Sequence, residues 1–257
     1  RGSKARSQYY IPRELEGFGK HTIMDSGLFT LMFGAAKGKK DEKFLNKWMH
    51  ELVGFVKESG FQGSCVEVDC QKVLSPEHAW KFRREMRKLL PDHKIINVFH
   101  LEDGMKGLDK LIDFSNYIAL SVPEFRIHRG RTFKQDIKKL TRYIKNRKPE
   151  IDIHLLGCTD NQMLKENDFC TSADSTTWSA IIRWGNTPLV INGKRIVKHI
   201  SQLNEKEIIE RYRERIFSIP RKYNLTLEGN QLLNHAKVCM AGEMHLHEYD
   251  YLLGFQK

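Results

Sequence analysis

The chain has 257 residues, of which 40% are hydrophobic and 29% are charged, and its formal net charge is +11. This length can bury a sizeable core, and the composition is that of a globular protein, so a disordered chain is excluded. No apolar run approaches the roughly 20 residues of a membrane span, so we expect no membrane partner. The positive charge favours a polyanionic partner, because Lys and Arg side chains that neutralise phosphates release counterions; a charged surface that serves only solubility is the alternative.

The cysteines indicate a reducing compartment. Their number, five, is odd, and the chain has no Cys-x-x-Cys pair. Four of them lie in or beside apolar runs, which is typical of reduced thiols and not of a disulfide framework. The N-terminus lacks the charged and then apolar segments of a signal sequence. We therefore expect a cytoplasmic protein, and we interpret Arg1-Gly2-Ser3 as a cloning remnant.

Short apolar runs alternate with longer amphipathic ones, which predicts strands that alternate with helices. Strands are expected at 21–24, 65–68, 95–101, 117–120, 151–156 and 172–173, with further strand or hairpin segments at 181–183 and 189–196. Helices are expected at 41–59, 76–90, 105–114, 131–148 and 162–166, and the chain is expected to turn helical from 204 onward. The run at 95–101 is almost continuously apolar, as in a parallel strand that is buried on both faces.

This alternation predicts an α/β fold with a mostly parallel sheet. A doubly wound sheet is the alternative, but neither of its phosphate-binding glycine loops, GxGxxG or GxxxxGK[ST], is present. A (β/α)8 TIM-type barrel fits better, because it needs about 250 residues and places its active site at the C-terminal ends of its strands. We predict one compact barrel domain over 1–257, with a helical C-terminal part at 204–257.

Polar side chains follow several predicted strands at the point where each strand ends. Asp25, Asp69 and Asp174 each come directly after a strand, and His100 closes another. Because the carboxyl ends of barrel strands share one mouth, three carboxylates there indicate a site; turn-forming or helix-capping aspartates are the alternative. Two carboxylates that face each other across a sugar can form a covalent glycosyl intermediate and move protons, and this chemistry needs no metal or nucleotide cofactor.

The segment Met24-Asp25-Ser26-Gly27-Leu28-Phe29 is the first of several strand ends that match one family. It resembles the Asp-Ser-Gly-Gly-Phe/Tyr segment of the tRNA-guanine transglycosylases, which are (β/α)8 enzymes that exchange a guanine in a polynucleotide for a 7-deazaguanine. Val66-Glu67-Val68-Asp69 resembles the strand whose aspartate reads the base. Asn97-Val98-Phe99-His100 stands in the place of Val-Gln-Gly-Gly, with His100 where Gln is usual.

The later strand ends continue the resemblance in the same order, over 22–178. Ile118-Ala119-Leu120-Ser121-Val122-Pro123-Glu124 resembles Gly-Gly-Leu-Ala-Val-Gly-Glu. His154-Leu155-Leu156-Gly157 resembles Tyr-Leu-Met-Gly. Ser172-Ala173-Asp174-Ser175 stands where the family carries its nucleophile.

The resemblance implies a role for each matching residue. Asp174 would attack C1′ of the target nucleoside as guanine leaves, and Asp25 would be the general base for the incoming base. Asp69 would accept hydrogen bonds from N1–H and the exocyclic amine of a guanine-like base and so reject adenine. Phe29 and Leu156 would sandwich the base; core packing is the alternative for both. The base-binding set is Asp69, Phe29, Ser26, His100, Ala119, Leu120, Leu156 and Gly157.

The chain departs from the family at its zinc site. The motif Cys-x-Cys-x-x-Cys followed by His is missing, so we expect no metal and no other cofactor. A zinc site built from His235, Cys239, His245 and His247 is the alternative, although zinc prefers ligands from a short knuckle. Because His100 stands where the family has Gln, the sequence does not predict which 7-substituent the incoming 7-deazaguanine carries.

The zinc-less chain, with Ser-Thr-Thr-Trp at 175–178, resembles the virus-encoded members that place 7-deazaguanines such as preQ0 in DNA as protection against restriction. The expected function is therefore a pentosyltransferase acting on DNA, in the host cytoplasm if viral. The alternatives are exchange on tRNA, a non-catalytic nucleic-acid-binding barrel and a glycosidase of small substrates. The protein could also form a homodimer. Backbone contacts are expected from Arg126, Arg129, Arg131, Lys134, Lys138, Arg183, Lys194 and Arg195, with a solvated outer helix as the alternative for 131–148.

Overall fold

The computed structural model describes residues 22–28, 41–158, 160–175, 185–191 and 194–199, and the single positions 202, 204, 206, 209, 210, 213, 214, 236, 237 and 239. The chain divides into two compact units. The first unit comprises residues 1–156 and 170–172, and the second comprises residues 157–169 and 173–257. Most residues of the predicted base-binding set lie in the first unit, whereas Gly157 and Asp174 lie in the second.

Six strands form one sheet in which the order in space is the order in the chain. They are β1 (Ile23–Met24), β2 (Ser64–Val66), β3 (Ile95–Phe99), β4 (Tyr117–Ser121), β5 (Asp152–Leu156) and β6 (Ser172–Ala173). Each pair from β1 to β5 is parallel. The sheet is curled into a half-barrel. The predicted α/β class and parallel sheet are therefore confirmed, but closure into an eight-stranded barrel is not confirmed by the described residues.

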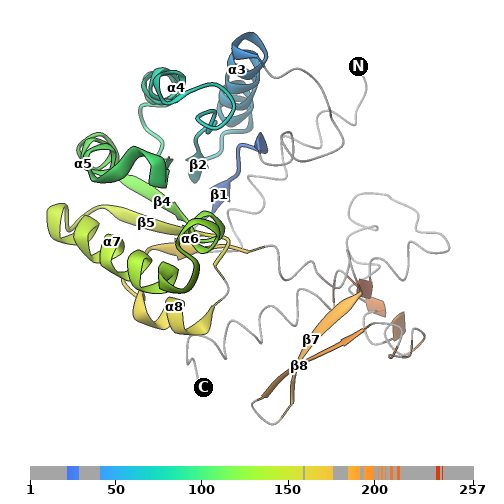
Figure 1. Cartoon of the computed structure of the whole chain (residues 1–257). Helices are drawn as coiled ribbons and strands as arrows, with labels where there is room; N and C mark the ends of the chain where they lie inside the picture. Colours follow the sequence, from blue (N-terminus) through green and yellow to red (C-terminus); the bar gives the residue numbers. More distant parts are fainter. Residues whose placement is uncertain are drawn as a thin grey trace, which may run out of the picture. The chain divides into compact units, whose positions relative to one another are not determined.

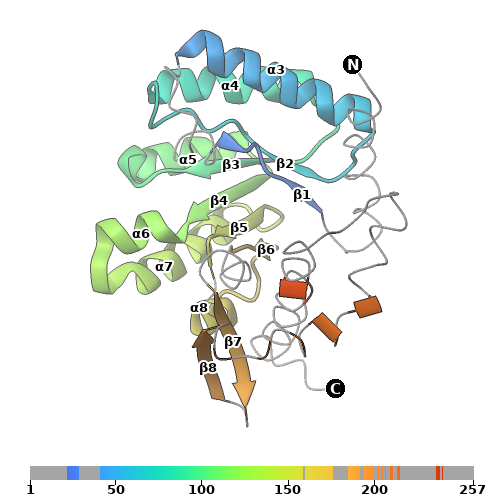
Figure 2. The same ribbon diagram turned by 90° about the vertical axis from the view of Figure 1, so that its right-hand side faces the viewer.

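The helices of the first unit connect successive strands. They are α3 (Glu42–Ser59), α4 (Pro76–Leu89), α5 (Gly104–Phe114), α6 (Val122–Arg129) and α7 (Phe133–Arg147), with short 3-10 segments η1 (Leu101–Asp103) and η2 (Gly130–Thr132). Figures 1 and 2 show α3, α4, α5 and α7 in an arc along one face of the sheet. This placement follows from repeated β-α-β crossovers of one hand, which put successive helices on the same side.

Sequence signals at the helix ends account for most of the boundaries. The Asp41 side chain accepts a hydrogen bond from the backbone N–H of Phe44 at 2.9 Å and caps α3. Ser75 caps α4, and Pro76 takes the first helical position. The expected helix at 131–148 is shorter, since its first turn is the segment η2.

Helix α6 was not predicted, although its start carries a recognisable signal. The Ser121 side chain accepts a hydrogen bond from the backbone N–H of Glu124, and Pro123 lies in the first turn. The helix ends at Arg129, and the cap residue Gly130 has a φ of 53° and a ψ of −121°, in a region that favours glycine. This turn lets α6 and α7 pack against each other.

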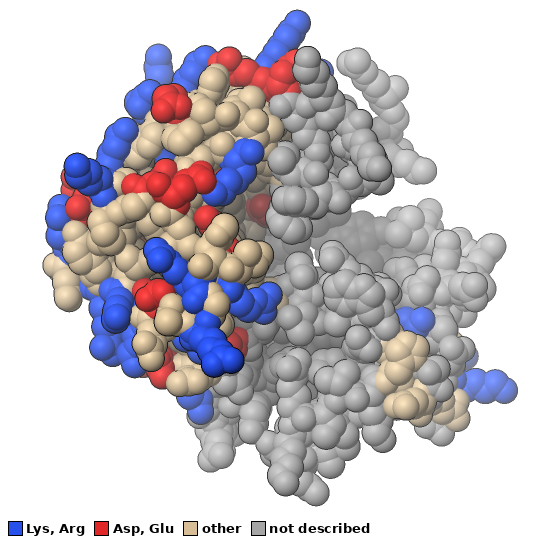
Figure 3. All heavy atoms as spheres, in the orientation of Figure 1, with Lys and Arg blue, Asp and Glu red and all other residues tan. Residues whose placement is uncertain are grey.

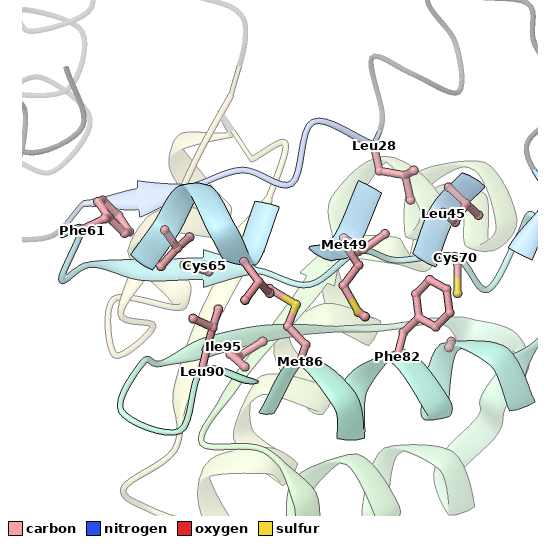
Figure 4. Packing of buried hydrophobic residues seen from close by; sticks show 14 residues of the cluster. Leu28, Leu45, Met49, Phe61, Cys65, Cys70, Phe82, Met86, Leu90 and Ile95 are labelled. Carbon is pink, nitrogen blue, oxygen red and sulfur yellow. The ribbon is translucent and has the colours of Figure 1, made fainter. Parts of the chain in front are cut away.

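Both faces of the sheet are buried, which explains the continuous apolar runs of its strands. On one face, Cys65 and Ile95 pack with Met49 of α3 and Phe82 of α4, as Figure 4 shows. On the other face, a second cluster contains Val66, Ile96, Val98, Tyr117 and Ala119. Neighbouring residues along a strand alternate between these two clusters, as the pleat of a strand requires.

The described part of the second unit contains helix α8 (Asn161–Glu166) and an antiparallel hairpin of β7 (Asn186–Ile191) and β8 (Lys194–His199). The pairing of Leu189 with Ile196 confirms the hairpin predicted around 189–196. The segment 181–183 and most of 204–257 lie outside the described residues. Nowhere in the described ranges does a helix combine the length and apolar character needed to cross a bilayer.

Candidate functional site

Asp69, His100 and Glu124 form a hydrogen-bonded cluster in the segments that follow β2, β3 and β4. His100 Nε2 lies 2.9 Å and 3.0 Å from the two carboxylate oxygens of Asp69, and His100 Nδ1 lies 3.1 Å from Glu124 Oε2. The second Glu124 oxygen accepts the backbone N–H of Leu101 at 3.3 Å. The side chain of His100 is only 5% exposed, whereas that of Asp69 is 23% exposed. The imidazole is therefore buried between two carboxyl groups, one of which reaches solvent.

The two carboxyl groups keep His100 in its charged form. Burial alone would lower the pKa of the imidazole, but the hydrogen bonds and charges of Asp69 and Glu124 outweigh it and raise the pKa to about 10. Both ring nitrogens of a charged imidazole are donors, which matches an acceptor at each nitrogen. Burial also opposes ionisation of Glu124, yet the hydrogen bond from His100 keeps the pKa of Glu124 lowered. His100 is thus a cation at neutral pH that orients the Asp69 carboxyl group.

Polar contacts tie the segment after β2 to the segment after β3. Lys72 Nζ lies 2.6 Å from Glu102 Oε2 and 3.6 Å from Glu124 Oε1. Gln71 Nε2 donates to Glu102 Oε1 at 2.9 Å and to Asp103 Oδ1 at 2.8 Å. Asp69 lies two residues before Gln71 in the chain, so these contacts restrain the segment that carries it.

A buried ion pair lies next to this cluster in the chain. Arg83 of α4 contacts the Glu67 carboxylate through three hydrogen bonds of 2.9–3.0 Å and donates to the carbonyl of Val98 at 2.7 Å. Asn97 Nδ2 donates to Glu67 Oε2 at 2.6 Å, and the backbone N–H of Val98 donates to Glu67 Oε1 at 2.9 Å. The side chains of Arg83 and Glu67 are 2% and 3% exposed. This network joins α4 to β3 and supports the strand ends from inside.

Asp25 follows β1 on a turn that is held from α3. Its side chain is exposed, while Ser26 is buried. Trp48 Nε1 donates to the Ser26 carbonyl at 2.9 Å, and Gly27 has a φ of 71°, a conformation that favours glycine. The turn therefore presents the Asp25 carboxyl group to solvent at the carboxyl end of β1.

Asp174 follows β6, and its contact lies within the second unit. Its side chain is exposed, and Asp174 Oδ1 accepts the backbone N–H of Gly157 at 2.9 Å. Gly157 directly follows β5 and has a φ of 65°. The predicted nucleophile and the predicted base-binding glycine are thus brought together. Asp25 belongs to the other unit, so the opposition of Asp25 and Asp174 across one slot stays a prediction.

The apolar members of the base-binding set lie in the sheet. Ala119 and Leu120 of β4 are fully buried, and their backbones pair with β3 and β5. Leu156 is half-buried at the end of β5 and packs against the cluster that contains Val66 and Ala119. Leu156 therefore packs partly in the core and is partly exposed to solvent. Phe29 lies outside the described residues.

The predicted nucleic-acid contacts fall on three elements. Arg126, Arg129 and Arg131 are exposed on α6 and η2, and Lys134 and Lys138 are half-exposed on α7. Figure 3 shows blue side chains gathered over the region where Figure 1 places α6 and α7. Lys194 and Arg195 belong to β8, and Arg183 lies outside the described residues.

Sequence reasoning missed Glu124, Lys72 and Trp48 as parts of the site. Glu124 lies 24 residues from its partner His100, and Trp48 lies 22 residues from Ser26. The signal that could have revealed Glu124 is the Ser121 cap, because it predicts a helix whose first turn places Glu124 beside the end of β4. Nothing in the local sequence of Trp48 or Lys72 marks the contacts that they make.

No family model matches the sequence, and no curated protein matches it either. Among the described residues, no group of three or more His, Cys, Asp or Glu side chains is arranged to hold a metal ion.

The raised pKa of His100 predicts a loss of stability in alkali. A histidine whose pKa is higher in the folded state stabilises the fold fully below its unfolded pKa, about 6.5, and this contribution disappears as the pH rises through about 10. The free energy of unfolding of the wild type should therefore fall between these pH values. His100→Gln removes the titrating group, so the free energy of unfolding of this variant should change less over the same pH range. Denaturant unfolding at a series of pH values measures both, and parallel profiles would show that His100 is not charged in the fold.

Proposed function

We propose that this protein exchanges guanine in DNA for a 7-deazaguanine through a covalent glycosyl–aspartate intermediate. The observation that carries the proposal is the carboxyl group of Asp69, which reaches solvent beyond β2 and is held in one orientation by the buried His100 cation. A fixed carboxyl group suits a ligand with two adjacent N–H donors. The Watson–Crick edge of guanine has such a pair in N1–H and the exocyclic amine.

The selectivity of such a site follows from unsatisfied hydrogen bonds. A carboxylate has about four acceptor positions, so Asp69 Oδ2 can accept a donor from a base while His100 contacts both oxygens and the Gln71 N–H contacts Oδ1 at 3.4 Å. Adenine has an unprotonated N1 at the corresponding position, which would face the carboxylate without a donor. Sites built to bond a specific N–H reject analogues that lack it by about 10⁴-fold or more.

In the proposed reaction, a carboxylate oxygen of Asp174 attacks C1′ of the target nucleoside. The new C1′–O bond forms as the C1′–N9 bond breaks, and guanine leaves with the electron pair and a proton supplied by Asp25. The incoming 7-deazaguanine then gives its N9 proton to Asp25 and attacks C1′ with N9, which releases the Asp174 carboxylate. Protons and charges balance, because Asp25 reverses its role between the two steps, as carboxylates do in retaining glycosidases.

The exposed positions of Asp25 and Asp174 support these roles, because both carboxyl groups are open to a substrate. The hydrogen bond from Gly157 also supports the assignment of Asp174, since an N–H donor fixes the orientation of the carboxyl group. The exposed arginines of α6 and η2 supply the positive surface that a polynucleotide needs.

An exchange assay tests the proposal. The protein is incubated with labelled guanine or labelled preQ0 and, side by side, with duplex DNA, single-stranded DNA and tRNA. We expect label in DNA and none in tRNA. Label in tRNA alone would contradict DNA as the substrate. Salt-sensitive DNA binding without label in any polymer would indicate the non-catalytic alternative, and hydrolysis of free nucleosides would indicate a glycosidase.

A further inference from the structure

Helix α6 exposes an apolar side chain within a basic stretch of the sequence. Ile127 is 76% exposed, the highest value among the large hydrophobic residues that the structure describes. Its chain neighbours Arg126, His128 and Arg129 are exposed as well, and so is Arg131 of η2. A single exposed isoleucine is not unusual. Its surroundings and its place on the helix set this one apart.

Ile127 lies on the same side of α6 as Glu124, one turn further along the helix. Residues three apart in a helix are surface neighbours, and three residues advance the axis by about 4.5 Å. Glu124 in turn contacts His100, which holds Asp69. The residues that α6 buries are Val122 and Phe125, which occupy the opposite side of the helix. Ile127 therefore lies about one turn from Glu124 on α6 and points away from the core.

The cations near Ile127 in the chain are exposed and can reach a ligand. Arg126, Arg129 and Arg131 have no ion-pair partner within the described ranges. By contrast, Arg83, Lys72 and Arg147 of the same unit are paired with carboxylates. Three exposed arginines on α6 and η2 that have no acidic partner among the described residues, together with an exposed apolar side chain on α6, fit a polyanion that also has an apolar interior, and stacked nucleic acid has both properties.

We propose that Ile127 is a wedge that enters the base stack of duplex DNA, while Arg126, Arg129 and Arg131 hold the phosphates on either side. This inference rests on the proposed function, because it specifies duplex DNA as the form of the substrate. A base inside a duplex has to leave the stack before the half-buried Asp69 can bond its Watson–Crick edge. An apolar side chain that enters the stack offsets part of the lost stacking and bends the duplex, by about 20–90° in minor-groove proteins that use such wedges.

Binding and bending of DNA test the wedge without relying on base exchange. The probes are a mixed-sequence DNA duplex with a fluorophore at each end, its separate single strand and an RNA duplex of the same sequence. We expect the wild type to bend the DNA duplex, seen as increased energy transfer between the ends. Ile127→Ala should bind this duplex about tenfold more weakly and lose the bend, with unchanged single-strand affinity. Ile127→Leu keeps an apolar wedge and should retain both properties.

The arginines are tested through the salt dependence of binding. Each phosphate contact contributes about 0.9 to the slope of log affinity against log salt for duplex DNA. The triple variant Arg126→Gln, Arg129→Gln, Arg131→Gln should therefore lower this slope by about 2 to 3. The matched control is Lys57→Gln with Lys88→Gln, because these exposed lysines lie in the last turns of α3 and α4 and therefore at the amino ends of the strands. The control should leave the slope unchanged.

Several results would overturn the wedge. The first is that Ile127→Ala bends the DNA duplex as much as the wild type does. The second is that Ile127→Ala loses single-strand affinity as much as duplex affinity. The third is that the wild type bends the RNA duplex as much as the DNA duplex. If base exchange is still seen in such a case, the proposed function stands and only the wedge is lost. If the wild type bends DNA as expected but exchanges no base, the wedge stands and the proposed function is lost.

Discussion

Asp174→Asn is expected to abolish base exchange, with a loss on the order of 10⁴-fold or more, because the variant lacks the nucleophile. An asparagine keeps the oxygen that accepts the Gly157 N–H at this position, so the local fold should survive the change. The amide is far less nucleophilic than a carboxylate and cannot form the glycosyl ester. Incorporation of labelled guanine into DNA measures the loss, and DNA affinity should be unchanged.

Asp160→Asn is the matched control for this variant. Asp160 belongs to the same unit, and its side chain caps α8 by accepting the backbone N–H of Met163 at 3.0 Å. Asparagine is an equally good cap, so exchange should continue at the wild-type rate. If Asp174→Asn also exchanged bases at that rate, Asp174 could not be the nucleophile and the proposed reaction would be wrong.

Arg83→Met is expected to cause the largest loss of stability, about 3–5 kcal/mol in the free energy of unfolding. The substitution leaves the carboxylate of Glu67 buried without its cation, and the hydrogen bonds from Asn97 and Val98 cannot replace it. An uncompensated buried charge is costly even though an intact buried pair contributes little. Guanidinium unfolding, with the slope of the transition held constant, measures the change.

The double variant Glu67→Gln, Arg83→Met separates the effect of losing the ion pair from the cost of an unpaired buried carboxylate. It should be more stable than Arg83→Met alone, because the neutral amide is less costly to bury than an unpaired carboxylate. Lys81→Met on the same helix is the surface control: Lys81 is 56% exposed, and its contact with Glu42 should add little stability. A loss in Arg83→Met no larger than in Lys81→Met would contradict the buried pair.

The sequence alone was sufficient to predict the parallel α/β sheet and most of its elements. The strands around Ile95 and Tyr117 are apolar on both faces, and Ser75-Pro76 marks a helix start, so periodicity and capping identify them. Barrel closure could not be predicted in this way, because it depends on which strands pair at the edges and not on any local pattern. Helix α6 was missed because its eight residues hold only two buried side chains, Val122 and Phe125, too few for a periodic signal.

Part of the candidate site was also predictable. Asp69 and His100 follow the carboxyl ends of the neighbouring parallel strands β2 and β3, and such ends meet at one edge of a sheet, so their proximity follows from topology. The protonation of His100 does not follow, because it depends on burial between two carboxyl groups. The support of Asp25 by Trp48 likewise depends on how α3 packs against the turn after β1. Contacts of this kind appear only when the chain is folded.

The most direct test of the account is to detect the covalent intermediate. The protein is incubated with DNA, without an incoming base, and then denatured and digested for mass spectrometry. We predict a deoxyribosyl adduct on the peptide that contains Asp174, absent from Asp174→Asn and removed when 7-deazaguanine is added before denaturation. Base exchange that proceeds with no adduct, or with the adduct on another residue, would contradict the assignment of Asp174 as the nucleophile.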